Sequence, residues 1–269
     1  MNSQFIQKTR LAGKYAGFLL HSGNRYRVHS PFLFNLVEEV VRGKGVPDGF
    51  EKIEKTRQKC LKSREIINKT DYGGGGNRAS GEVYPVELRH IARTSLTTPR
   101  LAKRLSRLAI HLKAKRILEI GTSLGITSAH LAMARPGSSV MTLEGCPELC
   151  RIARMNFLHL GLANIELIEG RFEDTLPEAL RTLGSVDLVY IDGNHHKDAV
   201  LEYYEKCLPY VHNDTVIVFD DIRASAGMEQ AWDMIRLRPE VRISLDFFNS
   251  GWVFFRKESS RQHFRLRYI

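Results

Sequence analysis

The sequence predicts an α/β fold: a doubly wound, seven-stranded sheet with an antiparallel last strand, preceded by a helical extension. From Lys115 to residue 258, short apolar runs with strand character alternate with amphipathic stretches of helical length. Five strand–helix repeats are followed by two strands with no helix between them, which is typical of an open sheet that ends in a hairpin. Strands are expected at 116–120, 139–143, 165–168, 186–191, 215–219, 241–246 and 252–255, and helices at 126–134, 147–160, 176–183, 197–211 and 227–238.

Residues 1–110 are predicted to form the helical extension, and residues 111–269 the sheet domain. Ser30 and Pro31 begin a helix, because serine is a favoured N-cap and proline a favoured first helical residue. Further helices are expected at 50–68 and 99–112. The four glycines at 73–76 predict a mobile loop, because the Gly-Lys-Ser/Thr ending of a phosphate-binding loop is missing. We expect the extension to narrow the cleft above the strand ends, with Tyr72 and the glycine run as a lid.

Composition restricts the class of protein. The chain has 269 residues, 43% of them hydrophobic, which is enough to bury a sizeable core. No run of 18 apolar residues occurs, and the apolar patch at 16–20 is too short for a secretory signal, so a cytoplasmic protein without membrane spans is expected. No feature indicates an oligomeric state. The cysteines have neither CxxC nor zinc-site spacing and are expected to be reduced thiols: Cys60, Cys146, Cys150 and Cys207.

The formal charge of +10 is unevenly distributed. Residues 1–116 hold 24 Lys and Arg against 9 Asp and Glu, whereas residues 117–269 hold 16 against 21. A basic half joined to an acidic half is typical of proteins with an anionic partner such as RNA, and also of solvated helix faces. We favour the second interpretation, since basic charge alone identifies no ligand.

A glycine-bearing turn follows the first predicted strand, from Gly121 to Gly125. Glycine lets the backbone turn tightly here, so that a ligand can approach main-chain N–H groups. The spacing differs from the G-x-G-x-x-G of nicotinamide and flavin folds. Taken alone, the turn is equally consistent with an ordinary strand–helix connection.

Polar residues also follow the later strands. Glu144 ends the second strand, where a carboxylate can accept hydrogen bonds from both ribose hydroxyls of an adenosine ligand. Segments 169–174, 190–196 and 218–222 hold further polar residues after the third, fourth and fifth strands. Because open α/β sheets bind ligands at the carboxyl ends of their strands, a ligand site is expected at this edge.

These motifs resemble those of class I S-adenosylmethionine-dependent methyltransferases, in the O-methyltransferase-like branch with Asp-Gly-x-His after the fourth strand. The resemblance covers roughly residues 100–258 and implies a Rossmann-like sheet and S-adenosylmethionine as cofactor. Upstream, residues 28–32 and the glycine run resemble a bacterial subset of these methyltransferases, which adds nothing about substrate. The resemblance implies cofactor binding by Glu119, Gly121, Thr122, Ser123, Gly125, Thr127, Glu144, Gly145, Phe172, Glu173 and Asp192.

By the same resemblance, Asp192, Asp220 and Asp221 match the ligands of a divalent metal in metal-dependent members. Three carboxylates at adjacent strand ends repel one another unless a cation or protons intervene, and Mg²⁺ prefers such oxygen ligands. Asp192 and His195 are the expected catalytic residues, with His195 as general base because imidazole titrates near neutral pH. In the alternative interpretation, Asp192 binds cofactor or substrate without metal, Asp220 and Asp221 cap a helix, and His195 only supports the site.

The leading functional hypothesis is O-methylation of a small hydroxylated metabolite, assisted by Mg²⁺. The sulfonium donor is already activated, so alignment and desolvation suffice and no nucleophile set is expected. An RNA methyltransferase is the alternative, based on the basic N-terminal part and on the tail 261–268, where aromatic residues lie between arginines. No RNA-binding module is recognisable, however. A cofactor-binding protein without turnover is the third hypothesis.

Overall fold

The computed structural model describes residues 13–23, 30–46, 48–72 and 80–267. The glycine run at 73–76 and residues 28 and 29 lie outside them, so the predicted lid and part of the upstream motif are not described. Within the described ranges, none of the helices combines the length and the apolar character needed to cross a membrane.

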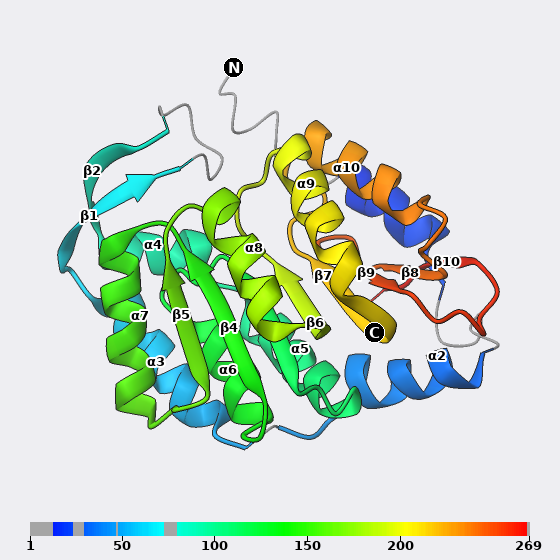
Figure 1. Cartoon of the computed structure of the whole chain (residues 1–269), viewed down its shortest axis with the longest axis horizontal. Helices are drawn as coiled ribbons and strands as arrows, with labels where there is room; N and C mark the ends of the chain where they lie inside the picture. The colour runs from blue at the N-terminus through cyan, green and yellow to red at the C-terminus, as the bar shows by residue number, and fades with distance from the viewer. Residues whose placement is uncertain (1–12, 24–29, 47, 73–79, 268–269) are drawn as a thin grey trace.

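A large sheet organises the structure, in the strand order β10-β8-β9-β7-β6-β3-β4-β5 (Figure 1). All neighbouring strands run parallel except β9, which is antiparallel to both β7 and β8. The predicted doubly wound α/β fold is therefore confirmed, and the strand predicted at 252–255 is the antiparallel β9. The strands are β3 (Arg116–Ile120), β4 (Ser139–Glu144), β5 (Ile165–Glu169), β6 (Val186–Ile191), β7 (Val211–Phe219), β8 (Ile243–Asp246), β9 (Gly251–Phe254) and β10 (Gln262–Arg265).

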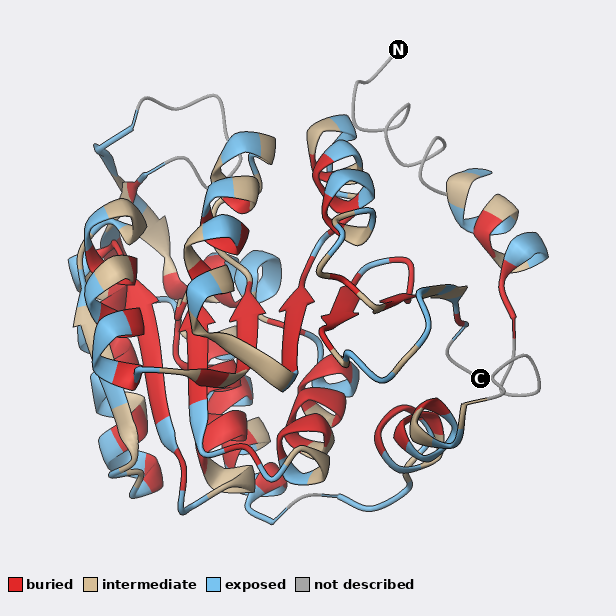
Figure 2. Cartoon of the chain, turned by 45° about the vertical axis from the view of Figure 1, so that its right-hand side comes forward, coloured by how far each residue is buried: buried red, intermediate tan, exposed pale blue. Residues whose placement is uncertain are grey.

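Helices cover both faces of this sheet, because successive strand residues point to opposite sides. On one face, Ile117 belongs to a core shared with the helices of the N-terminal part. On the other face, Leu118 belongs to a core closed by the last three helices of the alternating part. The central strands are buried along most of their length (Figure 2). The covering helices are α2 (Pro31–Leu36), the π-helical turn η2 (Val37–Val41), α5 (Pro99–His111) and α6 (Ile126–Ala134) on the first face, and α8 (Phe172–Leu183), α9 (Lys197–Cys207) and α10 (Ala226–Arg236) on the second.

Two expectations about the elements were wrong. The sheet has eight strands rather than seven, because β10 adds to its edge beside β8. The N-terminal part is not wholly helical: α3 (Phe50–Lys62) ends early, and β1 (Ile66–Asp71) pairs antiparallel with β2 (Glu82–Glu87). After this hairpin comes α4 (Leu88–Ser95), and a third core joins α3 and α4 to α6 and α7 (Pro147–Leu160). The predicted division near residue 110 stays a prediction, since residues on both sides of it share the first core.

Candidate functional site

A cavity of about 1190 Å³ lies at the carboxyl ends of the parallel strands. The predicted ligand edge is where it opens, since residues that follow β3, β4, β5, β6 and β7 all line it. The hairpin strand β1 contributes Lys69 and Thr70, and the helix of residues 13–21 contributes Tyr15. Residues of the sheet domain and of the N-terminal part therefore line the cavity together.

The turn after β3 depends on Gly121. Its φ of +104° is disfavoured for other residues, and a Cβ here would lie 2.7 Å from the carbonyl oxygen of Asp192. The N–H groups of Gly121 and Thr122 both donate to Leu143 O at 3.0 Å, which holds the turn against the next strand. Ser123 follows, and its buried Oγ has no hydrogen-bond partner among the described residues. The turn thus presents an unsatisfied hydroxyl beside the cavity, as a polar ligand requires.

Glu144 is held in place at the end of β4. The N–H of Ser123 donates to Glu144 Oε2 at 2.8 Å, and the N–H of Cys146 donates to Oε1 at 2.9 Å. Burial raises the pKa of Glu144, while these two N–H groups and the charge of Lys69 oppose that rise. The carboxylate lines the cavity and has lone pairs left for a ligand with hydroxyl donors.

Four residues predicted to bind the cofactor do not line the cavity: Glu119, Thr122, Gly125 and Thr127. Glu119 is fully buried in the sheet, and its Oε2 accepts a hydrogen bond from Thr142 Oγ1 at 2.6 Å and another from Ser128. Burial raises its pKa to about 7. Thr127 Oγ1 donates to Thr97 at 3.0 Å. Thr122 and Gly125 are part of the turn itself, whereas Glu119 and Thr127 bond to other side chains next to it.

The remaining predicted cofactor residues do line the cavity: Gly121, Ser123, Glu144, Gly145, Phe172, Glu173 and Asp192. Phe172 and Glu173 lie in the first turn of α8, which begins four residues earlier than expected. Gly193 allows Phe172 to approach, since a Cβ at Gly193 would lie 2.5 Å from its ring.

Tyr72 packs over Gly145, where a Cβ would meet its ring at 2.7 Å, and the guanidinium of Arg171 lies 5.9 Å from the ring centre. Lys69 was not predicted to lie at the site, and only its sequence neighbour Tyr72 pointed to it. Arg171 was included only as part of the polar segment 169–174 at the expected ligand edge.

Asp192 and Asp220 lie on either side of the buried hydroxyl of Tyr190. This hydroxyl is 2.6 Å from Asp220 Oδ2, 3.1 Å from Asp192 Oδ2 and 3.0 Å from Thr97 Oγ1. It has one proton, so it can donate to only one of the two carboxylates at a time. Burial and the charge of Asp221 raise the pKa of Asp220 to about 6. Burial, followed by the charges of Asp220 and Asp221, raises the pKa of Asp192 well above its usual value.

Asp221 is placed differently from its two neighbours. Its backbone adopts a left-handed φ of 50°, its side chain is 55% exposed, and its Oδ2 lies 4.0 Å from Nε2 of His195. Among the described residues, no three His, Cys, Asp or Glu side chains are grouped as metal ligands. The backbone turn at Asp221 places its carboxylate near His195, and metal binding by Asp192, Asp220 and Asp221 together stays a prediction. His195 itself lines the cavity, and burial lowers its pKa.

Several other lining residues were not anticipated from the sequence. Tyr15 reaches the cavity from the helix of residues 13–21, and residues 247–250 reach it from the β8–β9 connection. Tyr15 and Phe248 meet edge to face, with ring centres 4.8 Å apart. No local pattern indicates this contact, because 232 intervening residues separate the two rings.

The chain is similar to known proteins in the part that forms the sheet. Residues 118–222 match a family model described as a methyltransferase domain. The chain is 35% identical over 128 residues to a catechol O-methyltransferase of Mycobacterium tuberculosis, an alignment that covers 47% of this chain and 56% of that relative. Residues 118–222 are therefore similar to methyltransferase domains, and the curated relatives that match this part of the chain include O-methyltransferases.

Two further comparisons give the same likeness to O-methyltransferases. It is 31% identical over 128 residues to a catechol O-methyltransferase of Niastella koreensis, covering 46% of the chain and 57% of that relative. It thus spans little more than half the length of these curated relatives. The structure of an O-methyltransferase from Bacillus cereus in complex with S-adenosylhomocysteine superposes with a TM-score of 0.55 at 20% identity, covering 83% of this chain and 97% of that one. At that identity the likeness establishes the fold.

Proposed function

We propose that the protein is an S-adenosylmethionine-dependent O-methyltransferase that acts on a small hydroxylated acceptor. The observation that carries this proposal is the carboxylate of Glu144, fixed by two backbone N–H groups at the rim of the Gly121 turn. A fixed acceptor of this kind, beside a cavity large enough for a nucleoside and a second molecule, suits an adenosine ligand.

Different residues of the chain would bind different parts of the cofactor. Glu144 would accept hydrogen bonds from the ribose hydroxyls, and the ring of Phe172 would flank the base. Ser123 Oγ, which has no partner among the described residues, would bond to the polar part of the ligand. When bound, S-adenosylmethionine supplies a methyl group on an activated sulfonium, so the protein needs to align and desolvate the acceptor.

Removal of the acceptor proton is assigned to His195. The lowered pKa of His195 leaves its imidazole neutral at pH 7, ready to accept a proton at a ring nitrogen. Asp221, 4.0 Å from Nε2, would stabilise the imidazolium that forms. Asp192 is then placed to orient the acceptor hydroxyl, as the second expected catalytic residue.

We also propose that Mg²⁺ assists the reaction, held by two carboxylates of the protein. Mg²⁺ is commonly bound by one or two carboxylates together with waters and substrate oxygens. Asp192 and Asp220 fit that donor set, because both carboxylates line the cavity and have raised pKa values with no cationic side chain paired to them among the described contacts. A bound Mg²⁺ would lower the pKa of the acceptor hydroxyl.

The two alternatives find less support. In the basic tail, Phe264 packs against the first core, so its ring is not free to stack on bases, and His263 bonds to Ser244 Oγ at 2.8 Å. A protein without turnover would be expected to have a blocked cleft, whereas the cavity here is open. We also propose a cytoplasmic location, supported by four free, buried cysteines.

Calorimetric titration with S-adenosylhomocysteine tests the cofactor site. Glu144→Ala and Gly121→Val should abolish binding, whereas the control Glu148→Ala should bind like the parent, since Glu148 lies outside the cavity on α7 and pairs with Arg151. Unchanged affinity in both site variants would refute the proposed function. Catechol, named for two of the relatives, is the first acceptor to assay.

A further inference from the structure

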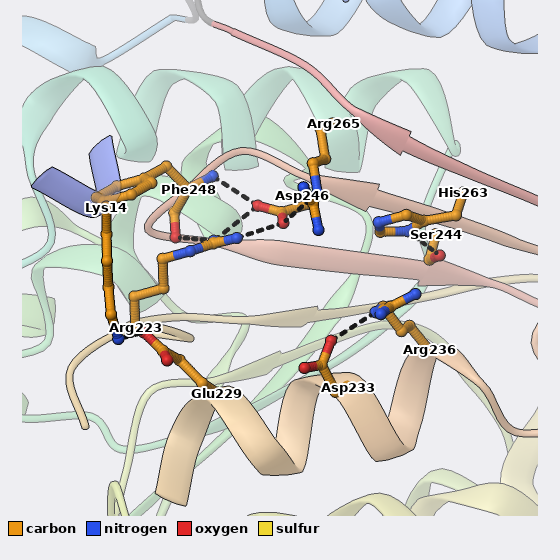
Figure 3. Close-up of polar contacts among 10 residues, drawn as sticks. All are labelled: Lys14, Arg223, Glu229, Asp233, Arg236, Ser244, Asp246, Phe248, His263 and Arg265. Atoms are coloured by element: carbon orange, nitrogen blue, oxygen red, sulfur yellow. Dashed lines mark hydrogen bonds and ion pairs between the residues drawn. The ribbon is translucent and has the colours of Figure 1, made fainter. Parts of the chain in front are cut away.

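Arg223 lies at the centre of a polar network behind the cavity (Figure 3). Its Nη1 and Nη2 bond to the two carboxylate oxygens of Asp246 at 2.8 and 2.6 Å. Nη1 also donates to the carbonyl oxygen of Phe248 at 2.6 Å, and the N–H of Phe248 donates back to Asp246 Oδ1 at 2.8 Å. Both charged side chains are largely buried, with exposed fractions of 15% and 2%. This network ties the segment after β7 to the start of the β8–β9 connection.

The network constrains a backbone that would otherwise be unfavourable. Phe248 has a φ of +73°, a left-handed conformation that a bulky residue adopts only when its surroundings impose it. Two hydrogen bonds supply that constraint: the Phe248 N–H donates to Asp246, and its carbonyl oxygen accepts from Arg223. Residues 247–250, which the network holds, all line the cavity.

The same network holds the helix of residues 13–21. The guanidinium of Arg223 lies 4.9 Å from the ring centre of Phe248 and 5.4 Å from that of Phe18. Phe248 also meets Phe18 edge to face, with ring centres 5.4 Å apart. An ion pair between Lys14 and Glu229 attaches the helix to α10 (Figures 1 and 3). Tyr15, next to Lys14 and one turn before Phe18, packs on Phe248 and lines the cavity.

The strand order indicates which side of the cavity Arg223, the 247–250 segment and the helix of residues 13–21 occupy. Glu144 ends β4, near one edge of the sheet, whereas Asp246 ends β8, near the other edge. Asp192 and Asp220, at the ends of β6 and β7, lie between them in the strand order. A cofactor gripped at Glu144 therefore leaves the β8 end of the cavity for the second substrate.

We propose that Arg223 is a positioning residue that locks the helix of residues 13–21 onto the 247–250 segment, so that Tyr15 and Phe248 form the wall against which the acceptor binds. The proposal rests on the proposed function, because it assigns the second substrate of the same cavity. It gives the N-terminal helix a direct part in acceptor binding, with Arg223 acting through Phe248 rather than on the substrate.

Two variants test this without unpairing the buried carboxylate. Arg223→Lys keeps the charge beside Asp246 but removes the bidentate pair. Tyr15→Ala removes an outer ring that is 47% exposed and leaves the network intact. Arg256→Lys is the matched control, because Arg256 also pairs with an aspartate, Asp214, and lies 4.2 Å from a ring centre, that of Phe32, yet neither of these partners lines the cavity.

Three readouts separate a positioning role from a general loss of structure. With catechol as acceptor, both variants should raise KM at least fivefold, while kcat and the Kd for S-adenosylhomocysteine stay within twofold of the parent. Amide hydrogen exchange at residues 13–21 should accelerate at least tenfold in Arg223→Lys and remain unchanged in Arg256→Lys.

An unchanged KM, an equal loss of cofactor affinity, or unchanged exchange at residues 13–21 would overturn the proposal. So would a parent protein that binds S-adenosylhomocysteine but neither binds nor methylates catechol. Absence of cofactor binding in the parent would instead refute the proposed function, and the exchange data would still decide whether Arg223 anchors the helix.

Discussion

The backbone N–H of Ser123 donates to Glu144 Oε2 at 2.8 Å, which couples the turn after β3 to the end of β4. The turn and the carboxylate therefore form one unit, although 20 residues separate them in the sequence. A substitution in the turn should therefore displace the Glu144 carboxylate, and a substitution of Glu144 should alter the turn.

Glu144→Gln tests the carboxylate without removing its bulk. An amide cannot accept from both Ser123 and Cys146 with its two ends, so one N–H loses its acceptor and the ribose contact weakens. We expect S-adenosylhomocysteine affinity to fall by about 1–2 kcal/mol, or roughly 5- to 30-fold, in calorimetric titration. Glu148→Gln is the control, and equal affinity of both variants would contradict the role of Glu144.

Gly121→Ala tests the close approach of the turn to β6. The new Cβ would lie 2.7 Å from Asp192 O at a φ of +104°, so strain and a backbone clash add together. Gly161→Ala is a matched control, because Gly161 has a φ of +72° with nothing within 4 Å and suffers strain alone. We expect Gly121→Ala to unfold in urea with a free energy lower than that of the control by at least about 2 kcal/mol. Equal stabilities would mean that the turn relaxes.

The sheet was largely predictable because strand and helix periods alternate clearly from residue 115 onward. β10 was missed because its four residues form a strand only by pairing with β8. β1 was missed because the polar segment that precedes it continues the pattern of α3, and its strand state depends on pairing with β2. Tertiary contacts decided the structure in both places.

The polar residues that line the cavity after β4 and β6 were predictable for a related reason. Polar residues at strand ends reach a common edge in any parallel sheet, so Glu144 and Asp192 could be placed from sequence position alone. Glu119 lies one residue before the end of β3, in register with Thr142, and is buried in the core, where Ser128 and Thr142 satisfy one carboxylate oxygen. The acceptor side could not be predicted, because Tyr15 and Phe248 meet only through the folded chain.

The pH dependence of turnover should report His195. Burial lowers its pKa below the ordinary value of 6.5, so the neutral base is already present at pH 7 and is lost only as the pH falls through the lowered pKa. We expect kcat/KM with catechol, whose pH dependence reports the free enzyme, to be flat from pH 7 to 8 and to decline at lower pH with a midpoint below 6.5. In His195→Asn the rate should drop at least about 100-fold and lose this inflection, as expected for a missing general base. An inflection that persists in this variant would assign the base to another group.

Magnesium binding should depend on Asp220 but not on Asp221. At a hundredfold excess over its Kd, a ligand that binds only the folded state stabilises it by about 2.7 kcal/mol, or roughly 5 °C in Tm for a chain of this size. Mg²⁺ should produce such a shift in the parent and in Asp221→Asn, since the Asp221 carboxylate is exposed and faces His195. Asp220→Asn should abolish the shift, because it removes one of the two carboxylates around Tyr190. Scanning calorimetry of the three proteins with and without Mg²⁺ is the measurement. If Mg²⁺ shifts none of them, methyl transfer here proceeds without a metal; a shift lost in Asp221→Asn would mean that its side chain turns inward to complete the site.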